Sequence, residues 1–180
     1  MALLTDFLYF RMVMMFSVSI NRRLTCSLDR AFKAPMLCDV TLVHTGFGLM
    51  PRITGVSHDE DWGKPGGSKR IYAAQSITQK GGFVSVDHVL ERIENTRWKI
   101  RVDQFQSWML GFYQFDGCWE TNETTPGFVE IRYSYDLFAK GLILYPFQWA
   151  FAKLFWKQYM KKVFSNVEDL INNKTPYLYA

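Results

Sequence analysis

The chain has 180 residues, of which 48% are hydrophobic and 17% aromatic, and its formal net charge is only +4. This length is sufficient for one domain with a hydrophobic core. No more than two Lys or Arg are adjacent, which argues against a nucleic-acid partner. Because the three cysteines have no metal-ligand spacing, we expect reduced thiols in a cytoplasmic protein without a metal or other cofactor.

The N-terminal segment 1–20 is apolar enough to suggest a signal peptide or a membrane span. Asp6 and Arg11 interrupt it, no basic start precedes it and no small-residue cleavage site follows it. We therefore expect no integral membrane span, but an N-terminal arm over residues 1–11 and a first strand over residues 12–24. The arm could instead pack on a partner chain, and a homodimer is one such arrangement.

Two short helices are expected after this first strand. Ser27 is a suitable N-cap and Pro35 a suitable stop, which predicts a helix over residues 28–34 that ends at the proline. A second short helical segment is expected over residues 37–44.

The middle of the chain alternates between apolar and polar residues in short runs separated by turn residues, which is typical of antiparallel strands. The cluster Gly63-Lys64-Pro65-Gly66-Gly67 marks one of these turns. We predict six successive strands, over residues 53–58, 68–76, 83–93, 98–104, 109–121 and 129–135.

The segment Leu142–Ile171 has no glycine after its start and a single proline, Pro146, in its first turn, so it is expected to form one long helix. Its first half is apolar nearly all round and its second half is amphipathic, with the change near Phe155. A helix that is apolar on every side must cover another apolar surface. We therefore predict an α+β fold in which a curved antiparallel sheet of about six to seven strands wraps around this helix and leaves a cavity beneath it.

Three features resemble the START-like (SRPBCC) superfamily, which includes polyketide cyclase/dehydrase-like and Bet v 1-like proteins. They are the turn over residues 63–70, the strand end Tyr133-Ser134-Tyr135 and the long C-terminal helix. The resemblance covers residues 12–172 and leaves residues 173–180 as a C-terminal tail. It implies the helix-grip fold, and it implies that a hydrophobic small molecule, lipid-like or polyketide-like, binds in a cavity between the sheet and the helix.

Alternation places several polar side chains on strand faces that also carry apolar residues. His88 would share its face with Val84, Val86 and Leu90, and a histidine that titrates near neutrality could act as an acid or base. A hydrogen-bonded structural histidine is the alternative. The candidate ligand-binding residues are Tyr72, His88, Gln104, Tyr113, Trp119, Tyr133, Tyr135, Trp149 and Phe151.

The acidic residues are expected to have structural roles. The run Asp59-Glu60-Asp61 is expected to form a solvated loop, since hard cations require several oxygen ligands in a closed geometry. Asp87, Asp103 and Asp116 are expected on the outer faces of neighbouring strands, where Arg101 or Lys99 could pair with them.

The sequence leaves three functions open. The first is the binding of a hydrophobic or aromatic small molecule without catalysis. The second is a cyclase or dehydratase that acts on a polyketide-like substrate with His88 as acid or base. The third is a membrane- or protein-interaction module that uses residues 1–10 or the aromatic helix.

Overall fold

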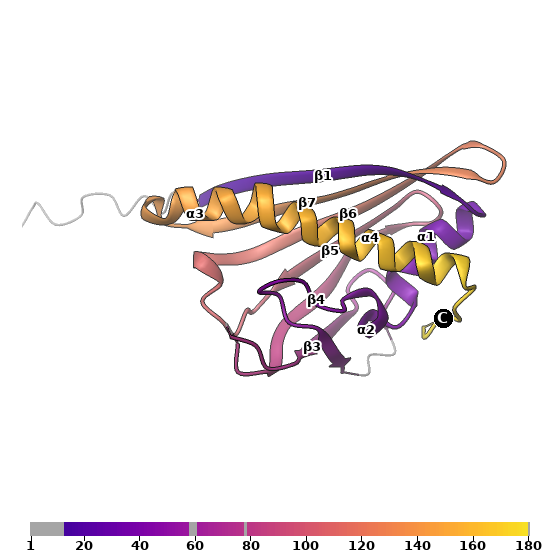
Figure 1. Ribbon diagram of the computed structural model, residues 1–180. Coiled ribbons are helices and arrows are strands. Elements are labelled where there is room, and N and C mark those ends of the chain that lie inside the picture. Colours follow the sequence, from indigo (N-terminus) through magenta and orange to yellow (C-terminus); the bar gives the residue numbers. More distant parts are fainter. Residues whose placement is uncertain (1–12, 58–60, 78, 180) are drawn as a thin grey trace, which may run out of the picture.

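The computed structural model describes residues 13–57, 61–77 and 79–179, which form a curved antiparallel sheet beneath a long C-terminal helix (Figure 1). The strands are β1 (Val13–Thr25), β2 (Ile53–Val56), β3 (Ser68–Ala73), β4 (Gly82–Ile93), β5 (Arg97–Asp103), β6 (Phe112–Thr125) and β7 (Phe128–Lys140). Their order in the sheet is β1-β7-β6-β5-β4-β3-β2, so the first strand pairs with the last. The expected sheet and covering helix are therefore confirmed.

Two short helices, α1 (Leu28–Leu37) and α2 (Val40–Val43), follow β1 as predicted, and Ser27 caps α1. A 3₁₀ turn, η1 (Met109–Gly111), precedes β6. The long helix is confirmed, but it includes a π-helical stretch at the point where the sequence pattern changes. Its successive parts are η2 (Leu142–Leu144), α3 (Tyr145–Ala150), the π-helical η3 (Phe151–Trp156) and α4 (Lys157–Asn172).

Several strand boundaries differ from the prediction. The strand expected from residue 109 begins only at Phe112, because Met109 and Leu110 have φ angles of 45° and 54° and cannot continue a strand. The last strand extends beyond Tyr135 to Lys140. The expected arm over residues 1–11, and residues 59–60 of the acidic loop, lie outside the described residues.

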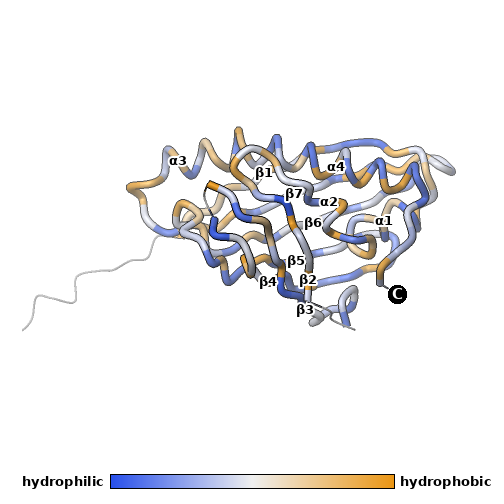
Figure 2. The backbone as a smooth tube through the Cα atoms, turned by 60° about the horizontal axis from the view of Figure 1, so that its bottom comes forward, coloured by the Kyte–Doolittle hydropathy of each residue, from blue (hydrophilic) through white to orange (hydrophobic). Residues whose placement is uncertain are grey.

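The core lies between the inner face of the sheet and α4. Figure 2 shows hydrophobic and hydrophilic residues alternating along α4, so that one side of this helix can face the sheet. Met160 and Val167 are fully buried, and the ring of Phe164 stacks on Trp119 of β6 with centroids 5.4 Å apart. Each such buried side chain stabilises the fold by roughly 1.5–3 kcal/mol.

The helix α1 continues through Pro35, although the sequence predicted that it would end before this residue. A proline inside a helix has no N–H, so the carbonyl four residues earlier, that of Ala31, loses its intrahelical donor. In the structure, Trp119 of β6 donates its indole N–H to this carbonyl at 3.1 Å. A side chain of the sheet thus replaces the hydrogen bond that the proline removes.

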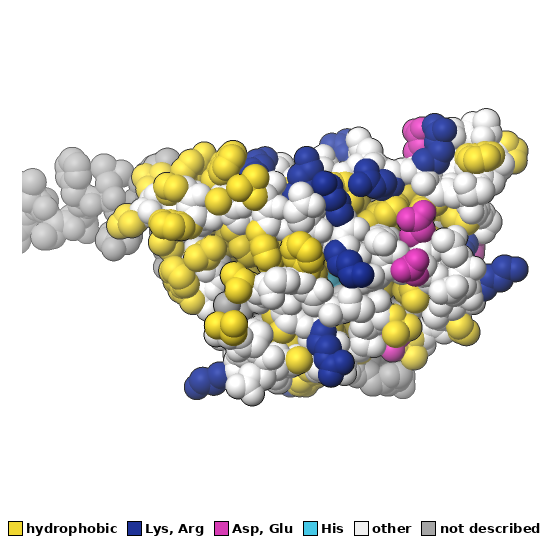
Figure 3. All heavy atoms as spheres, in the orientation of Figure 1, with side chains coloured by type: hydrophobic (Ala, Val, Ile, Leu, Met, Phe, Trp, Pro, Cys, Tyr) yellow, Lys and Arg dark blue, Asp and Glu magenta, His cyan; other side chains and the backbone are white. Residues whose placement is uncertain are grey.

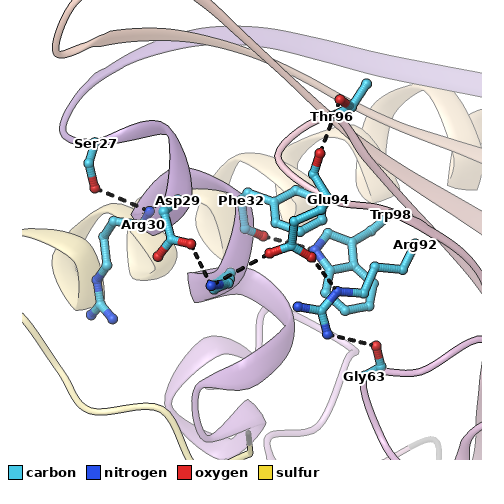
Figure 4. Close-up of polar contacts among 10 residues, drawn as sticks. Ser27, Asp29, Arg30, Phe32, Gly63, Arg92, Glu94, Thr96 and Trp98 are labelled. Carbon is cyan, nitrogen blue, oxygen red and sulfur yellow. Dashed lines mark hydrogen bonds and ion pairs between the residues drawn. The ribbon is translucent and has the colours of Figure 1, made fainter.

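Two further tryptophans fix α1 in the same way. Trp98 of β5 donates its indole N–H to the carbonyl of Phe32 at 3.0 Å, and the two rings stack with centroids 5.2 Å apart (Figure 4). Trp62, in the loop before β3, donates to the carbonyl of Met36 at 2.8 Å. These buried indole donors attach the backbone of α1 to the sheet and to the loop beside it.

Charged residues surround this contact at the surface. Lys33 of α1 pairs with Asp29 at 2.5 Å and with Glu94 at 3.5 Å. Arg92 of β4 pairs with Glu94 at 2.9 Å and donates to the carbonyl of Gly63 at 3.0 Å (Figure 4). Exposed ion pairs contribute about 0–1 kcal/mol each. The buried indole hydrogen bonds and apolar contacts therefore carry more of the stability at this end of the sheet.

Trp119→Phe should lower the free energy of unfolding by about 1–3 kcal/mol, because the buried carbonyl of Ala31 loses its indole donor. Pro35→Ala restores a backbone N–H four residues after Ala31, so in that background Trp119→Phe should cost less, by about 1 kcal/mol. Urea unfolding of the four proteins of this double-mutant cycle measures the coupling.

Trp98→Phe is the matched control. It also removes a buried indole donor, but its acceptor, the carbonyl of Phe32, lies four residues before Met36, which has a backbone N–H. Pro35→Ala should therefore leave the cost of Trp98→Phe unchanged. Equal costs of Trp119→Phe in the two backgrounds would contradict the role assigned to Pro35.

Candidate functional site

A cavity of about 110 Å³ lies between the sheet and the C-terminal helix. Strands β2 to β7 contribute its floor, and most of its wall is apolar, with Ile71 and Ala73 on β3 and Val102 on β5. A smaller hollow of about 50 Å³, nearer to α1, shares His44, Ile100 and Tyr135 with it. The two hollows therefore form adjoining parts of one interior site.

The roof of the cavity lies where the helix changes from π to α geometry. Trp156, the last residue of η3, and Tyr159, in the first turn of α4, both line it. A single π turn within an α-helix is often found at functional sites. Trp156 is only 5% exposed, and its indole Nε1 has no hydrogen-bond partner among the described residues. A buried donor at an apolar cavity is a position at which a ligand's acceptor atom can bind.

An acidic and a basic residue form a cross-strand pair on the neighbouring strands β3 and β4. Asp87 of β4 and Lys69 of β3 are opposite residues in this antiparallel pair, and Asp87 lines the cavity. Lys69 is buried, with its Nζ 3.6 Å from the ring centroid of Trp62. Burial raises the pKa of Asp87 to about 6, while the charges of Lys69 and His88 limit the rise. The carboxyl group of Asp87 therefore changes its charge close to neutral pH.

A histidine and two tyrosines add uncharged polar groups. His44, directly after α2, has its Nδ1 2.6 Å from Oη of Tyr159. Burial and the charge of Lys69 lower the pKa of His44 to about 4, so its imidazole is neutral at neutral pH. Burial raises the pKa of Tyr135 and Tyr159, so both phenols stay protonated and can donate hydrogen bonds.

Three of the residues predicted from the sequence do lie inside. Trp119, Tyr133 and Tyr135 are buried on the inner faces of β6 and β7 and line the smaller hollow, and Tyr135 also lines the larger cavity. Gly117 allows this arrangement, because a Cβ atom there would lie 2.7 Å from the ring of Tyr135. The role of these three residues in ligand binding stays a prediction.

His88 and Gln104 lie on the outer face of the sheet, so the prediction that they face the cavity is wrong. Asp87 lines the cavity, so its neighbour His88 points the other way, and the expectation that Asp87 lies outside is wrong for the same reason. His88 Nε2 lies 3.1 Å from Oδ1 of Asp103. Gln104 follows the end of β5 with a φ of 55° and borders the same outer groove as His88.

Tyr72 and Tyr113 also lie outside the cavity. Both neighbours of Tyr72 on β3 line the cavity, so Tyr72 faces outward. Next to Tyr113 an irregularity in the β6–β7 pairing breaks the alternation that relates it to Trp119. The ring of Tyr113 instead has Nζ of Lys140 4.7 Å from its centroid.

Trp149 and Phe151, also named as candidate ligand-binding residues, do not line the cavity. Trp149 is exposed on the outside of α3. Phe151 is half-buried and packs on the rings of Phe112 and Phe155, with centroids 5.3 Å and 5.4 Å away. In contrast, the predicted pairing of outer-face charges is confirmed for Asp116, which binds Arg101 at 2.9 Å.

Sequence reasoning missed the polar residues of the interior. Both faces of β4 carry apolar residues, so alternation alone did not show that Asp87 points inward. Trp156 belongs to a buried stripe of the helix and has no sequence signal that separates it from the core. One signal was available: Lys69 alternates with the apolar residues Ile71 and Ala73 on β3, which indicates that it shares their buried face. The missed residues are His44, Lys69, Asp87, Trp156 and Tyr159.

No protein-family model and no curated protein sequence matches the chain. Its structure nevertheless resembles solved structures at low sequence identity. Ara h 8.0201 gives a TM-score of 0.63 at 15% identity, over 89% of this chain and 99% of that protein. A START superfamily protein from Mycobacterium smegmatis gives 0.63 at 14% identity, over 88% and 99%. Norcoclaurine synthase from Thalictrum flavum, in complex with dopamine and hydroxybenzaldehyde, gives 0.64 at 10% identity, over 91% and 90%.

The chain has the START-like helix-grip fold. The resemblance expected from the sequence is thus confirmed at the level of the fold. A helix-grip fold supports different functions, so the activity has to be argued from the residues of the site. Within the described residues, no helix has the length and apolar character needed to cross a membrane.

Asp87→Asn should stabilise this helix-grip protein at about pH 7.5. Folding raises the pKa of Asp87 from 3.8 to about 6, so the stability that this group contributes is full below the lower value and is lost as the pH rises toward the upper one. Asparagine does not ionise and avoids this loss. We expect a gain of about 1–3 kcal/mol in the free energy of unfolding near pH 7.5 and almost none near pH 4, measured by urea unfolding.

Asp103→Asn, on the outer face of the neighbouring strand β5, is the control. It removes the carboxylate charge beside His88 and should stabilise the protein much less than Asp87→Asn does near pH 7.5. If Asp87→Asn instead lowered the stability near pH 7.5, attraction to Lys69 would outweigh the cost of burial, and the direction given for the pKa would be wrong.

Proposed function

We propose that this protein binds a small hydrophobic or aromatic molecule in the cavity between the sheet and the C-terminal helix, without changing it chemically. The observation that carries the proposal is an apolar cavity lined by Trp156, whose Nε1 has no hydrogen-bond partner in the part of the chain that the structure describes. Apolar walls supply affinity, and a few placed polar groups supply orientation. The three free cysteines support a reducing, cytoplasmic location.

The size of the cavity limits the ligand. Its volume of about 110 Å³ is below the roughly 300–1,000 Å³ of sites for drug-sized molecules. Together with the adjoining hollow of about 50 Å³, it is close to the roughly 150 Å³ of a cavity that can hold a benzene-sized ring. A one-ring compound, or one end of a longer lipid-like or polyketide-like molecule, fits best. The likeness to a synthase that holds dopamine and hydroxybenzaldehyde, both one-ring aromatic compounds, supports this choice.

The polar groups define where the ligand's own polar atoms would lie. An acceptor atom would take the hydrogen bond of Trp156 Nε1, and a hydroxyl or amino group would bind the carboxyl of Asp87. Tyr135, which stays protonated, could donate to a second acceptor. A ligand with a phenol or carbonyl group on an aromatic ring satisfies these conditions.

Ala73→Phe should reduce ligand binding at least tenfold. Ala73 is a buried inner residue of β3 that lines the cavity, so the added ring would occupy the space of the ligand. Isothermal titration calorimetry with 4-hydroxybenzaldehyde measures the affinity, and native mass spectrometry of the protein from its own cells detects a co-purified ligand. Circular dichroism establishes that the variant is folded.

His88→Ala is the control, because this residue lies on the outer face of the sheet and should leave the affinity within about twofold. The proposal would be wrong if the native protein bound neither the one-ring probe nor a larger apolar fluorescent probe at a single site. Loss of binding in His88→Ala, with binding kept in Ala73→Phe, would place the site outside the cavity.

Proton transfer to or from the bound molecule is a second candidate function. It is favoured by the pKa of Asp87, which lies near 6 within the cavity, whereas His88 does not reach this space. A ligand with an acidic C–H group should take up deuterium when incubated with the protein in D₂O, and Asp87→Asn should stop this uptake. Equal uptake with both proteins, or none with either, would exclude this candidate.

A further inference from the structure

The end of the molecule around α3 carries an exposed apolar surface. Ile143 is 92% exposed and Phe147 is 64% exposed. Figure 3 shows hydrophobic side chains gathered at this end of the molecule. Contiguous apolar surfaces on a folded protein mark interaction sites. We call this surface the apolar tip, and it consists of Leu142, Ile143, Tyr145, Phe147, Trp149 and Leu154.

The orientation of the tip is fixed by its contacts with the sheet. Gln148 of α3 is fully buried, and its Nε2 donates to the carbonyl of Leu110 at 2.9 Å and to that of Lys140 at 3.4 Å. The ring of Tyr145 lies 5.5 Å from the ring of Phe16 on β1. In α3 the buried residue is thus polar and the exposed ones are apolar, the reverse of an ordinary surface helix.

Positive charges follow the tip along the same helix. Lys153, Lys157 and Lys161 recur at intervals of four residues and form a lysine stripe on one side, in which Lys153 also donates to the carbonyl of Ser17 on β1. The first acidic residue of this helix is Glu168. Figure 3 shows Lys and Arg next to the hydrophobic end, with acidic residues farther along the molecule. An apolar end flanked by cations is complementary to a surface that is apolar inside and anionic outside.

We propose that the apolar tip inserts into the surface of a bilayer that contains anionic lipids, while the lysine stripe contacts their headgroups. Segments of this kind bury their apolar side roughly 5–10 Å deep and combine aromatic residues with Lys. Each lysine near an anionic surface strengthens binding about fivefold. The attachment is peripheral and does not require a spanning helix.

The same attachment brings the cavity close to the bilayer. Trp108, which is exposed, directly precedes η1, and Gln148 joins η1 to α3. Ser107 and Met109, the residues on either side of Trp108, line the cavity. A molecule dissolved in the bilayer would therefore have a short path to the cavity, a consequence that rests on the proposed ligand-binding function, whereas membrane attachment does not.

Co-sedimentation of the full chain with vesicles tests the attachment. Vesicles of phosphatidylcholine with about 30% phosphatidylserine should bind the protein at about 0.1 M salt, and binding should fall at least tenfold with phosphatidylcholine alone or at about 0.5 M salt. Ile143→Asp and Phe147→Asp should each reduce binding at least tenfold. Because Ile143 is 92% exposed, its substitution leaves the packing of the fold unchanged.

Phe128→Asp is the matched control, since Phe128 is 43% exposed in the hairpin between β6 and β7, at the opposite end of the sheet (Figure 1). It should leave vesicle binding unchanged. The proposal is overturned if the native chain does not bind the anionic vesicles, or if Phe128→Asp weakens binding as much as Ile143→Asp. It is also overturned if analytical ultracentrifugation shows a dimer that Ile143→Asp dissociates without any vesicle binding, because the tip would then join two copies.

Discussion

The donation of three buried indole N–H groups to the backbone of α1 is the constraint on which the rest of the structure depends. On one side, these bonds fix α1 against the sheet and the loop before β3. On its other side, Arg30 of α1 donates to the carbonyl of Leu170 at 2.8 Å and to that of Thr175 at 2.6 Å, so α1 also holds the C-terminal end of α4. Sheet and covering helix are therefore joined through α1, which closes one end of the space between them.

The interior combines this rigid frame with ionisable groups that are costly to bury. Asp87 and Lys69 face each other within the sheet, and burial still raises the pKa of Asp87. Opposite charges buried near each other contribute little net stability, since the cost of removing both charges from water offsets their attraction. Folding does not require the carboxyl group of Asp87 at the cavity, and its presence there is more easily explained by what the cavity holds.

The order of the elements could be predicted because it depends on repeating patterns, such as alternation in the strands and the unbroken apolar run before Phe155. Which side of each strand faces the interior could not be predicted from these patterns. On β4 both Val86 and Val89 are apolar, and only the packing of the sheet shows that Asp87 is inside. Local exceptions were also hidden, because Pro35 is tolerated in a helix only through a tryptophan 84 positions later in the chain. Long-range contacts of this kind leave no local signature.

The π-helical segment η3 has a consequence for how one helix can serve two surfaces. Each residue of an α-helix turns the next side chain by about 100°, so the extra residue accommodated by a π turn shifts the phase between the parts before and after it. The segment η3 therefore allows the apolar side chains of α3 to point outward while those of α4 point toward the sheet. Deleting one residue from η3 would bring α3 and α4 into a common helical phase. The apolar residues of α3 and those of α4 would then lie on the same side of the helix, so they could not form one exposed and one buried surface.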